Sequence, residues 1–115
     1  MIPIVKSYLP SKNKLIPKLE KVLYSGYIAQ GKIVDEFEIK FSDFIGNPYS
    51  VSVNSGSSAL HIALLLCGIK KGDEVISTPI TAEPTNTVIK QSGAKIVWAD
   101  IDPDTGNICP KDVEK

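Results

Sequence analysis

The stretch from Val51 to Gly68 constrains the fold more than any other part of the chain. It reads Val-Ser-Val-Asn-Ser-Gly-Ser-Ser-Ala-Leu-His-Ile-Ala-Leu-Leu-Leu-Cys-Gly. The β-branched residues of 49–53 favour a short strand, and the small polar residues of 54–58 favour a turn. The apolar run that follows predicts a buried helix, so this stretch indicates a strand–turn–helix unit of the kind found in α/β proteins.

The turn of this unit allows two interpretations. The first backbone N–H groups of a helix lack partners and carry partial positive charge, which suits them to hold a phosphate. Gly56 would let a ligand approach the backbone, and Ser57 and Ser58 would add hydroxyl donors. The alternative is a plain helix cap by Ser55 or Ser57, which needs no ligand. The turn matches neither the Walker pattern nor the dinucleotide-binding glycine pattern.

The remaining chain predicts helices alternating with strands. The predicted elements are helices over 13–25, 33–44 and 85–92, and further strands over 74–77 and 95–100. Such an alternation implies a parallel sheet with helices on both faces. Three strands make an incomplete sheet with open edges, and Pro110 begins what resembles only the first turn of a helix. We therefore expect the chain to be a fragment.

Composition excludes several classes of partner. The 13 basic residues, all lysine, balance 13 acidic residues, so charge favours neither nucleic acid nor an anionic membrane. Without arginine, side chains cannot clamp a phosphate bidentately. Cys67 and Cys109 lie far apart and form no metal-binding or redox spacing, and no signal peptide or membrane span is visible. The sequence predicts a soluble, cytoplasmic protein without a metal site.

Five short segments in a fixed order carry a family resemblance. They are Gly-Tyr-Ile-Ala-Gln-Gly at 26–31, Phe-Glu-Ile-Lys-Phe at 37–41, the turn and helix at 54–64, and the segments 68–76 and 93–102. In order and spacing they resemble the amino-terminal part of the DegT/StrS-type family of PLP-dependent sugar aminotransferases. The resemblance covers essentially all of this chain but only the first third of a family member.

The resemblance implies a fold and a function. The fold would be α/β, the amino-terminal part of the type I aminotransferase large domain, with three α/β/α layers and a mostly parallel sheet. Residues 1–48 would form amino-terminal helices and a loop at the active-site mouth, and 49–115 the incomplete first part of the PLP-binding domain. The enzyme would be a cytoplasmic homodimer in polysaccharide biosynthesis. It would transfer an amino group from an amino acid, commonly glutamate, to a nucleotide-linked keto-sugar.

The resemblance also implies which residues bind the cofactor, pyridoxal 5′-phosphate. Gly56 and Ser57 would hold its phosphate, in agreement with the first interpretation of the turn. The loop from Thr81 to Asn86 would lie beside the pyridine ring, with Thr81 and Ala82 as its cofactor-binding residues. Many family members have an aromatic residue at the position of Ala82 that stacks on the ring, and this chain cannot supply that stacking there.

Substrate contacts are implied for three residues, and the catalytic lysine is not among the residues of this chain. Tyr27 and Gln30 would lie near the active-site mouth, close to the substrate or the partner subunit. Glu83 would lie near the ring as a substrate contact or as a solvated loop residue. The Schiff-base lysine and the aspartate that pairs with the pyridinium nitrogen are expected beyond Lys115, so this segment alone is expected to be inactive.

Other notable residues have structural interpretations. We expect His61 to be a packed core histidine, Cys67 a buried inert thiol and Trp98 a core residue. Asp100 and Asp102 are expected to cap and bend the chain after a strand.

Three alternative functions remain open. The first is a PLP- or PMP-dependent sugar dehydratase of the same family, which would lack the lysine. The second is a non-catalytic relative. The third is a nucleotide-binding α/β module, which is disfavoured because neither glycine fingerprint is present.

Overall fold

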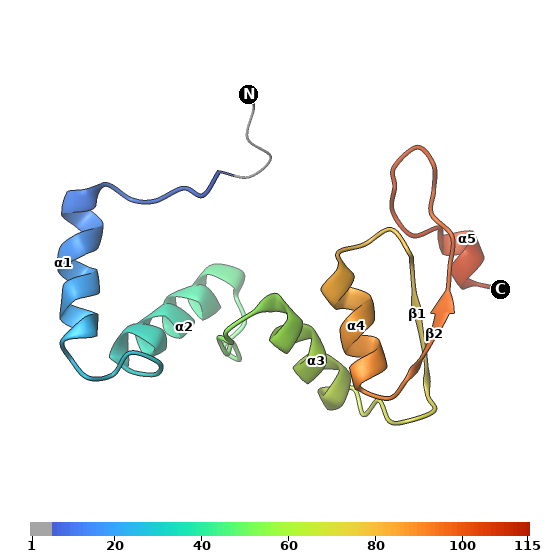
Figure 1. Cartoon of the computed structure of the whole chain (residues 1–115), viewed down its shortest axis with the longest axis horizontal. Coiled ribbons are helices and arrows are strands. Elements are labelled where there is room, and N and C mark those ends of the chain that lie inside the picture. The colour runs from blue at the N-terminus through green and yellow to red at the C-terminus, as the bar shows by residue number, and fades with distance from the viewer. Residues whose placement is uncertain (1–5) are drawn as a thin grey trace. The chain divides into compact units, whose positions relative to one another are not determined.

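The computed structural model describes residues 6–115, and the chain divides into two compact units, Met1–Ser52 and Val53–Lys115 (Figure 1). The first unit contains α1 (Lys12–Leu23) and α2 (Lys32–Ile45). The second contains α3 (Gly56–Leu66), β1 (Glu74–Ser77), α4 (Glu83–Gln91), β2 (Lys95–Trp98) and α5 (Pro110–Val113). Within residues 6–115, no helix has the length and apolar character needed to cross a bilayer.

The two helices of the first unit confirm the elements predicted from apolar periodicity. Helix α1 accommodates Pro17 in its interior, beyond the first turn to which the sequence would confine it. On α2, Phe37 and Phe41 stack with their ring centroids 5.8 Å apart, as expected for side chains four residues apart on one helix face. Helix α2 ends at Gly46, whose φ of 68° lies in the left-handed region that glycine adopts without strain.

A carboxylate ties α2 to the segment that follows it. Glu38 Oε1 accepts a hydrogen bond from the Ser52 backbone N–H at 2.7 Å and another from Ser52 Oγ at 2.8 Å. The backbone bond from Ser52, followed by the hydroxyl bond, lowers the pKa of Glu38 below its ordinary value. Both bonds favour the ionised carboxylate, so this contact is an acid-sensitive link within the first unit.

Acid is expected to release Ser52 from Glu38. Because the folded-state pKa of Glu38 is lowered, the contact is fully present above the ordinary glutamate pKa and is lost as the pH falls through the folded value. The Ser52 amide resonance in ¹⁵N NMR should therefore titrate with a midpoint below that of an unperturbed glutamate. The Glu38→Gln variant should show no such titration. A Ser52 titration that persists in this variant would contradict the assignment.

The strand predicted at 49–53 is absent, and this prediction was wrong. These residues form no ladder, and Val51 is 82% exposed. An extended segment becomes a strand only when a neighbour pairs with it, and no described segment does so here. The sheet consists of β1 and β2, which pair in parallel from Glu74↔Lys95 to Ser77↔Trp98. The two strands, their parallel pairing and α4 are confirmed. The expected covering of both faces of the sheet is not found in residues 6–115, where Ile76 and Val97 are exposed.

The core of the second unit lies where α4 covers the small sheet. Its buried apolar residues are Val88, Ile89, Ala94 and Ala99. Helix α4 contacts β2 on one side and α3 on the other. Each of the two strands has only four residues, so the sheet offers little surface for a helix to cover and the core remains small.

Several burial predictions were therefore wrong. Helix α3 was expected to be buried, but none of its residues is, and Leu66 is 83% exposed. Trp98, expected in the core, is 53% exposed although its register partner Ser77 lies on the face that α4 covers. Cys67, expected to be a buried thiol, is exposed at the end of α3, and His61 is half-buried.

The segment after β2 confirms the predicted role of Asp102. Its Oδ1 accepts hydrogen bonds from the N–H groups of Asp104 and Thr105, which bends the chain into a turn. Isolated antiparallel pairing of Ile101 with Ile108 closes the resulting loop. The short α5 follows, as the sequence predicted.

Candidate functional site

Two of the three serines at the start of α3 use their hydroxyls for hydrogen bonds within this segment. Ser55 is the N-cap residue, and its Oγ accepts a bond from the Ser58 N–H at 3.1 Å. Ser58 Oγ donates to Asn54 Oδ1 at 2.7 Å, so this hydroxyl is directed back into the turn. The capping interpretation is thus confirmed for Ser55. The cap satisfies only one of the unpaired N–H groups at the start of the helix.

The remaining donors at the start of α3 are free. Within residues 6–115, the N–H groups of Gly56 and Ser57 and the hydroxyl of Ser57 form no hydrogen bond to the protein. No atom lies within 4 Å of the position that a Cβ on Gly56 would occupy, so the space above this residue is open. Three donors at the positive end of an 11-residue helix form an arrangement that can hold an anion.

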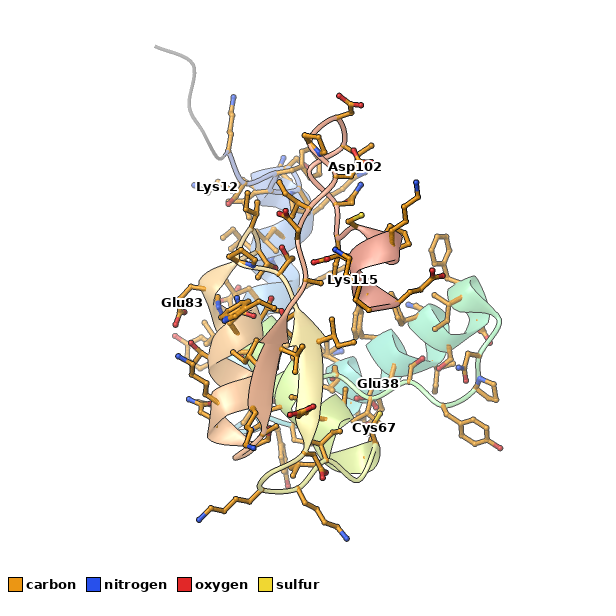
Figure 2. All side chains as sticks on the ribbon, turned by 90° about the vertical axis from the view of Figure 1, so that its right-hand side faces the viewer. Lys12, Glu38, Cys67, Glu83, Asp102 and Lys115 are labelled. Carbon is orange, nitrogen blue, oxygen red and sulfur yellow. The ribbon has the colours of Figure 1, made fainter. Side chains whose placement is uncertain are left out.

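A second group of candidate residues lies between β1 and α4. Thr81 and Ala82 are exposed and immediately precede α4, which begins at Glu83. Thr81 Oγ1 donates to Thr85 Oγ1 at 3.3 Å, and the Ala82 carbonyl accepts a bond from the Thr85 N–H at 3.0 Å. Glu83 is a helix residue whose carboxylate accepts a hydrogen bond from the Thr87 hydroxyl, and it projects outward from the start of α4 (Figure 2).

These residues share one side of the second unit. Helices α3 and α4 both begin on the side at which β1 and β2 end (Figure 1). In open parallel sheets, ligands bind outside the carboxyl ends of the strands, where loops and helix starts gather. The fold therefore brings Gly56, Ser57, Thr81 and Ala82 to the side where a ligand is expected.

Tyr27 and Gln30 belong to the other unit, in the loop between α1 and α2. Tyr27 is 74% exposed and lines a mainly apolar cavity of about 580 Å³, formed with the end of α1 and the start of α2. A Cβ on Gly31 would lie 3.2 Å from Tyr27 Cβ, so glycine allows the loop to close tightly against this tyrosine. Gln30 does not line the cavity.

Asn54 and Asn86 make contacts beside the candidate residues that the sequence analysis did not predict. Asn54 accepts the Ser58 hydroxyl, and Asn86 bonds to both Ser77 and Thr78 at the end of β1. A signal for Asn86 was available, because it lies three residues before Ile89 and so shares the buried face of α4. A polar residue at such a position needs a partner. In the described part of the chain, no cluster of His, Cys, Asp or Glu could hold a metal ion.

Comparison with known proteins identifies the family to which this sequence is similar. Residues 11–115 match the sequence model of the DegT/DnrJ/EryC1/StrS aminotransferase family. The spore coat polysaccharide biosynthesis protein SpsC of Bacillus subtilis is 42% identical over 112 residues, which are 93% of this chain and 29% of that protein. The UDP-2-acetamido-2-deoxy-3-oxo-D-glucuronate aminotransferase of Pseudomonas aeruginosa is 37% identical over 103 residues, 90% of this chain and 29% of that protein.

Solved structures agree with this match. The sugar aminotransferase CalS13 of Micromonospora echinospora superimposes with a TM-score of 0.87 at 38% identity, covering 98% of this chain and 30% of that one. NtdA of Bacillus subtilis with bound cofactor PMP has a TM-score of 0.84 at 30% identity, covering 89% of this chain and 23% of that one. These neighbours confirm the expected fold class. The chain spans 29% of the length of each of the two relatives.

Proposed function

The chain belongs to the DegT/DnrJ/EryC1/StrS aminotransferase family, and on this premise we propose that it forms the part of a sugar aminotransferase that binds the phosphate of pyridoxal 5′-phosphate. Residues 49–115 are the part that holds the cofactor, and residues 1–48 contribute the loop at the mouth of the active site. The bound cofactor supplies the electron sink that amino-group transfer requires.

The observation that carries this proposal is that the serines before and within α3 differ in whether their hydroxyls are already hydrogen-bonded. Ser55 and Ser58 use their hydroxyls within the turn, whereas Ser57 leaves its hydroxyl free beside two free N–H groups. A phosphate accepts three hydrogen bonds there, from the N–H groups of Gly56 and Ser57 and from Ser57 Oγ. Since the chain contains no arginine, its contribution to phosphate binding relies on these donors and the helix dipole.

The loop before α4 would contact the cofactor ring. Thr81 offers a hydroxyl and Ala82 only a methyl group, so the face of the ring at this position is covered by a small apolar contact rather than by a stacked aromatic side chain. Support for the loop's role comes from its position on the side of the unit where α3 begins.

The proposed reaction moves an amino group from an amino acid such as glutamate to a nucleotide-linked keto-sugar. Support comes from the P. aeruginosa relative, whose name specifies a UDP-linked oxo-sugar as substrate. Tyr27, Gln30 and Glu83 would contact substrate, with Tyr27 contributing an exposed aromatic ring and Glu83 an exposed carboxylate. A cytoplasmic homodimer is the proposed assembly.

Replacement of Ser57 tests the phosphate site. In a chimera that carries this chain in place of the aligned 103 residues of the P. aeruginosa aminotransferase, Ser57→Ala should weaken the affinity for pyridoxal 5′-phosphate. The lost bond is charge-assisted and worth about 1.5–3 kcal/mol, which corresponds to a roughly 10- to 150-fold rise in Kd. Titration of the cofactor-free chimera with pyridoxal 5′-phosphate, followed by absorbance, measures this Kd.

Ser58→Ala is the matched control for this test. Its hydroxyl is bonded to Asn54, so its removal should change the cofactor affinity less than Ser57→Ala does. Equal effects of the two substitutions would mean that the turn acts only as a helix cap. A folded chimera that retains no pyridoxal 5′-phosphate would overturn the proposed function itself.

A further inference from the structure

Asn86 is a single side chain that joins a strand, a loop and a helix. It lies on α4, and its Oδ1 accepts a hydrogen bond from Ser77 Oγ at 2.6 Å. Its Nδ2 donates to the carbonyl oxygen of Thr78 at 3.1 Å. The two ends of the amide therefore bind two consecutive residues, the last of β1 and the first of the loop that follows.

Ser77 provides a fixed point for this arrangement. It is 7% exposed, pairs with Trp98 in the sheet register, and its carbonyl accepts a bond from the Ala99 N–H at 2.8 Å. A buried hydroxyl needs a partner, and Asn86 supplies it. Because one end of the amide is held by this anchored serine, the other end can fix the Thr78 carbonyl in place.

The opposite end of the loop is held by the same helix. Thr85 binds both Thr81, through the two hydroxyls, and Ala82, through its backbone N–H. The loop from Thr78 to Ala82 is thus attached to α4 at both ends. Of these attachments, the one to Thr78 depends on a single side-chain N–H group, that of Asn86.

We propose that Asn86 is a positioning residue that fixes the backbone of the loop from Thr78 to Ala82 and thereby sets the places of Thr81 and Ala82. That this loop faces the cofactor ring rests on the proposed function. That Asn86 fixes the loop does not depend on the proposed function, so the two statements can be tested separately.

Backbone ¹⁵N relaxation tests the hold on the loop. It is measured on the 115-residue chain that carries Phe44→Lys and Leu66→Lys, because these two exposed apolar side chains would otherwise favour self-association. We expect Thr81 and Ala82 to have order parameters of about 0.85, which should fall below about 0.6 in Asn86→Ala. Ser92→Ala is the matched control, since it removes one hydrogen bond, to the Ile89 carbonyl, at the far end of α4. Loop order parameters that are the same in Asn86→Ala and Ser92→Ala would overturn the proposal.

Two further variants separate the two bonds of Asn86. Asn86→Asp keeps an acceptor for Ser77 but places a carboxylate oxygen against the Thr78 carbonyl, so it should mobilise the loop. Ser77→Ala removes only the bond to Ser77 and should mobilise it less. If Asn86→Ala does not fold, Asn86→Asp decides the question, because it retains the buried contact. An ordered loop in Asn86→Asp would then overturn the proposal.

Visible circular dichroism of the chimera tests the link to the cofactor. With pyridoxal 5′-phosphate at saturation, Asn86→Asp should change the induced dichroism of the bound cofactor at least twofold, whereas Ser92→Ala should not. A mobile loop with unchanged dichroism would overturn the link between this loop and the ring. A chimera that binds no cofactor would instead contradict the proposed function, and the relaxation data would still decide whether Asn86 holds the loop.

Discussion

Gly93→Ala is expected to unfold the unit Val53–Lys115 under conditions in which the unchanged chain is folded. Gly93 has a φ of +82°, where a residue with a Cβ costs about 1–2 kcal/mol. The new Cβ would also lie 3.2 Å from both Cα and Cβ of Lys71, and such overpacking costs about 1–3 kcal/mol more. Neither atom is the free end of a side chain, so the turn between α4 and β2 must shift. That shift would strain the bond from the Gly72 N–H to the Gly93 carbonyl.

Gly106→Ala provides the matched control. Gly106 has a similar φ of +70°, but no atom lies within 4 Å of its added Cβ. This variant should lose only the conformational part, about 1–2 kcal/mol. Urea unfolding of each variant in the chain that carries Phe44→Lys and Leu66→Lys, followed by circular dichroism at 222 nm, a wavelength that reports helix, compares the two free energies of unfolding. Equal losses would show that the contact with Lys71 costs nothing.

The 115-residue chain made by itself is expected to self-associate strongly. Large apolar side chains are exposed on both units, including Phe44 at 86% and Leu66 at 83%. Soluble monomers rarely leave extensive apolar patches open, and such patches drive association. Sedimentation velocity at micromolar concentrations should therefore detect oligomers or aggregates, and a dye that binds apolar surface should fluoresce in their presence.

Paired substitutions identify the cause of this association. Phe44→Lys and Leu66→Lys together should shift the chain toward monomer, because each removes an exposed apolar side chain and adds charge. Ser7→Lys with Asn13→Lys, at two exposed polar positions, controls for the two added charges alone. A monomeric unchanged chain with low dye fluorescence would contradict the prediction. Hydrogen exchange adds a second check, since Val51 and Val53 lie outside any ladder and should exchange much faster than Lys95 and Ala99, whose N–H groups donate to the carbonyls of Asp73 and Ser77.

Local sequence patterns were sufficient for most elements of the fold. Helices α1 and α2 follow from apolar residues at helical spacing, and the hydrogen bonds of a helix lie within the segment itself. The turn before α3 was likewise readable, because capping by a serine involves residues three positions apart. The family resemblance rested on five short segments of the same local kind, and the family match confirms it.

Burial and strand formation could not be predicted from local sequence patterns. Residues 49–53 have strand-like composition, yet a strand exists only when another segment pairs with it. The apolar run of α3 and Trp98 on β2 have core-like composition, yet their burial depends on the surface that faces them. In both cases the deciding contact comes from another segment, which a local pattern does not contain.

The candidate site was likewise predictable from the sequence only in part. The sequence by itself determined that a helix begins after a turn of small polar residues, and that this start is suited to an anion. Only the tertiary structure decided which serine caps the helix, which hydroxyl stays free, and that Asn86 reaches back to Ser77 and Thr78. The physical reason is that a hydroxyl or an amide has several partners within reach, and the fold selects among them by bringing one into place.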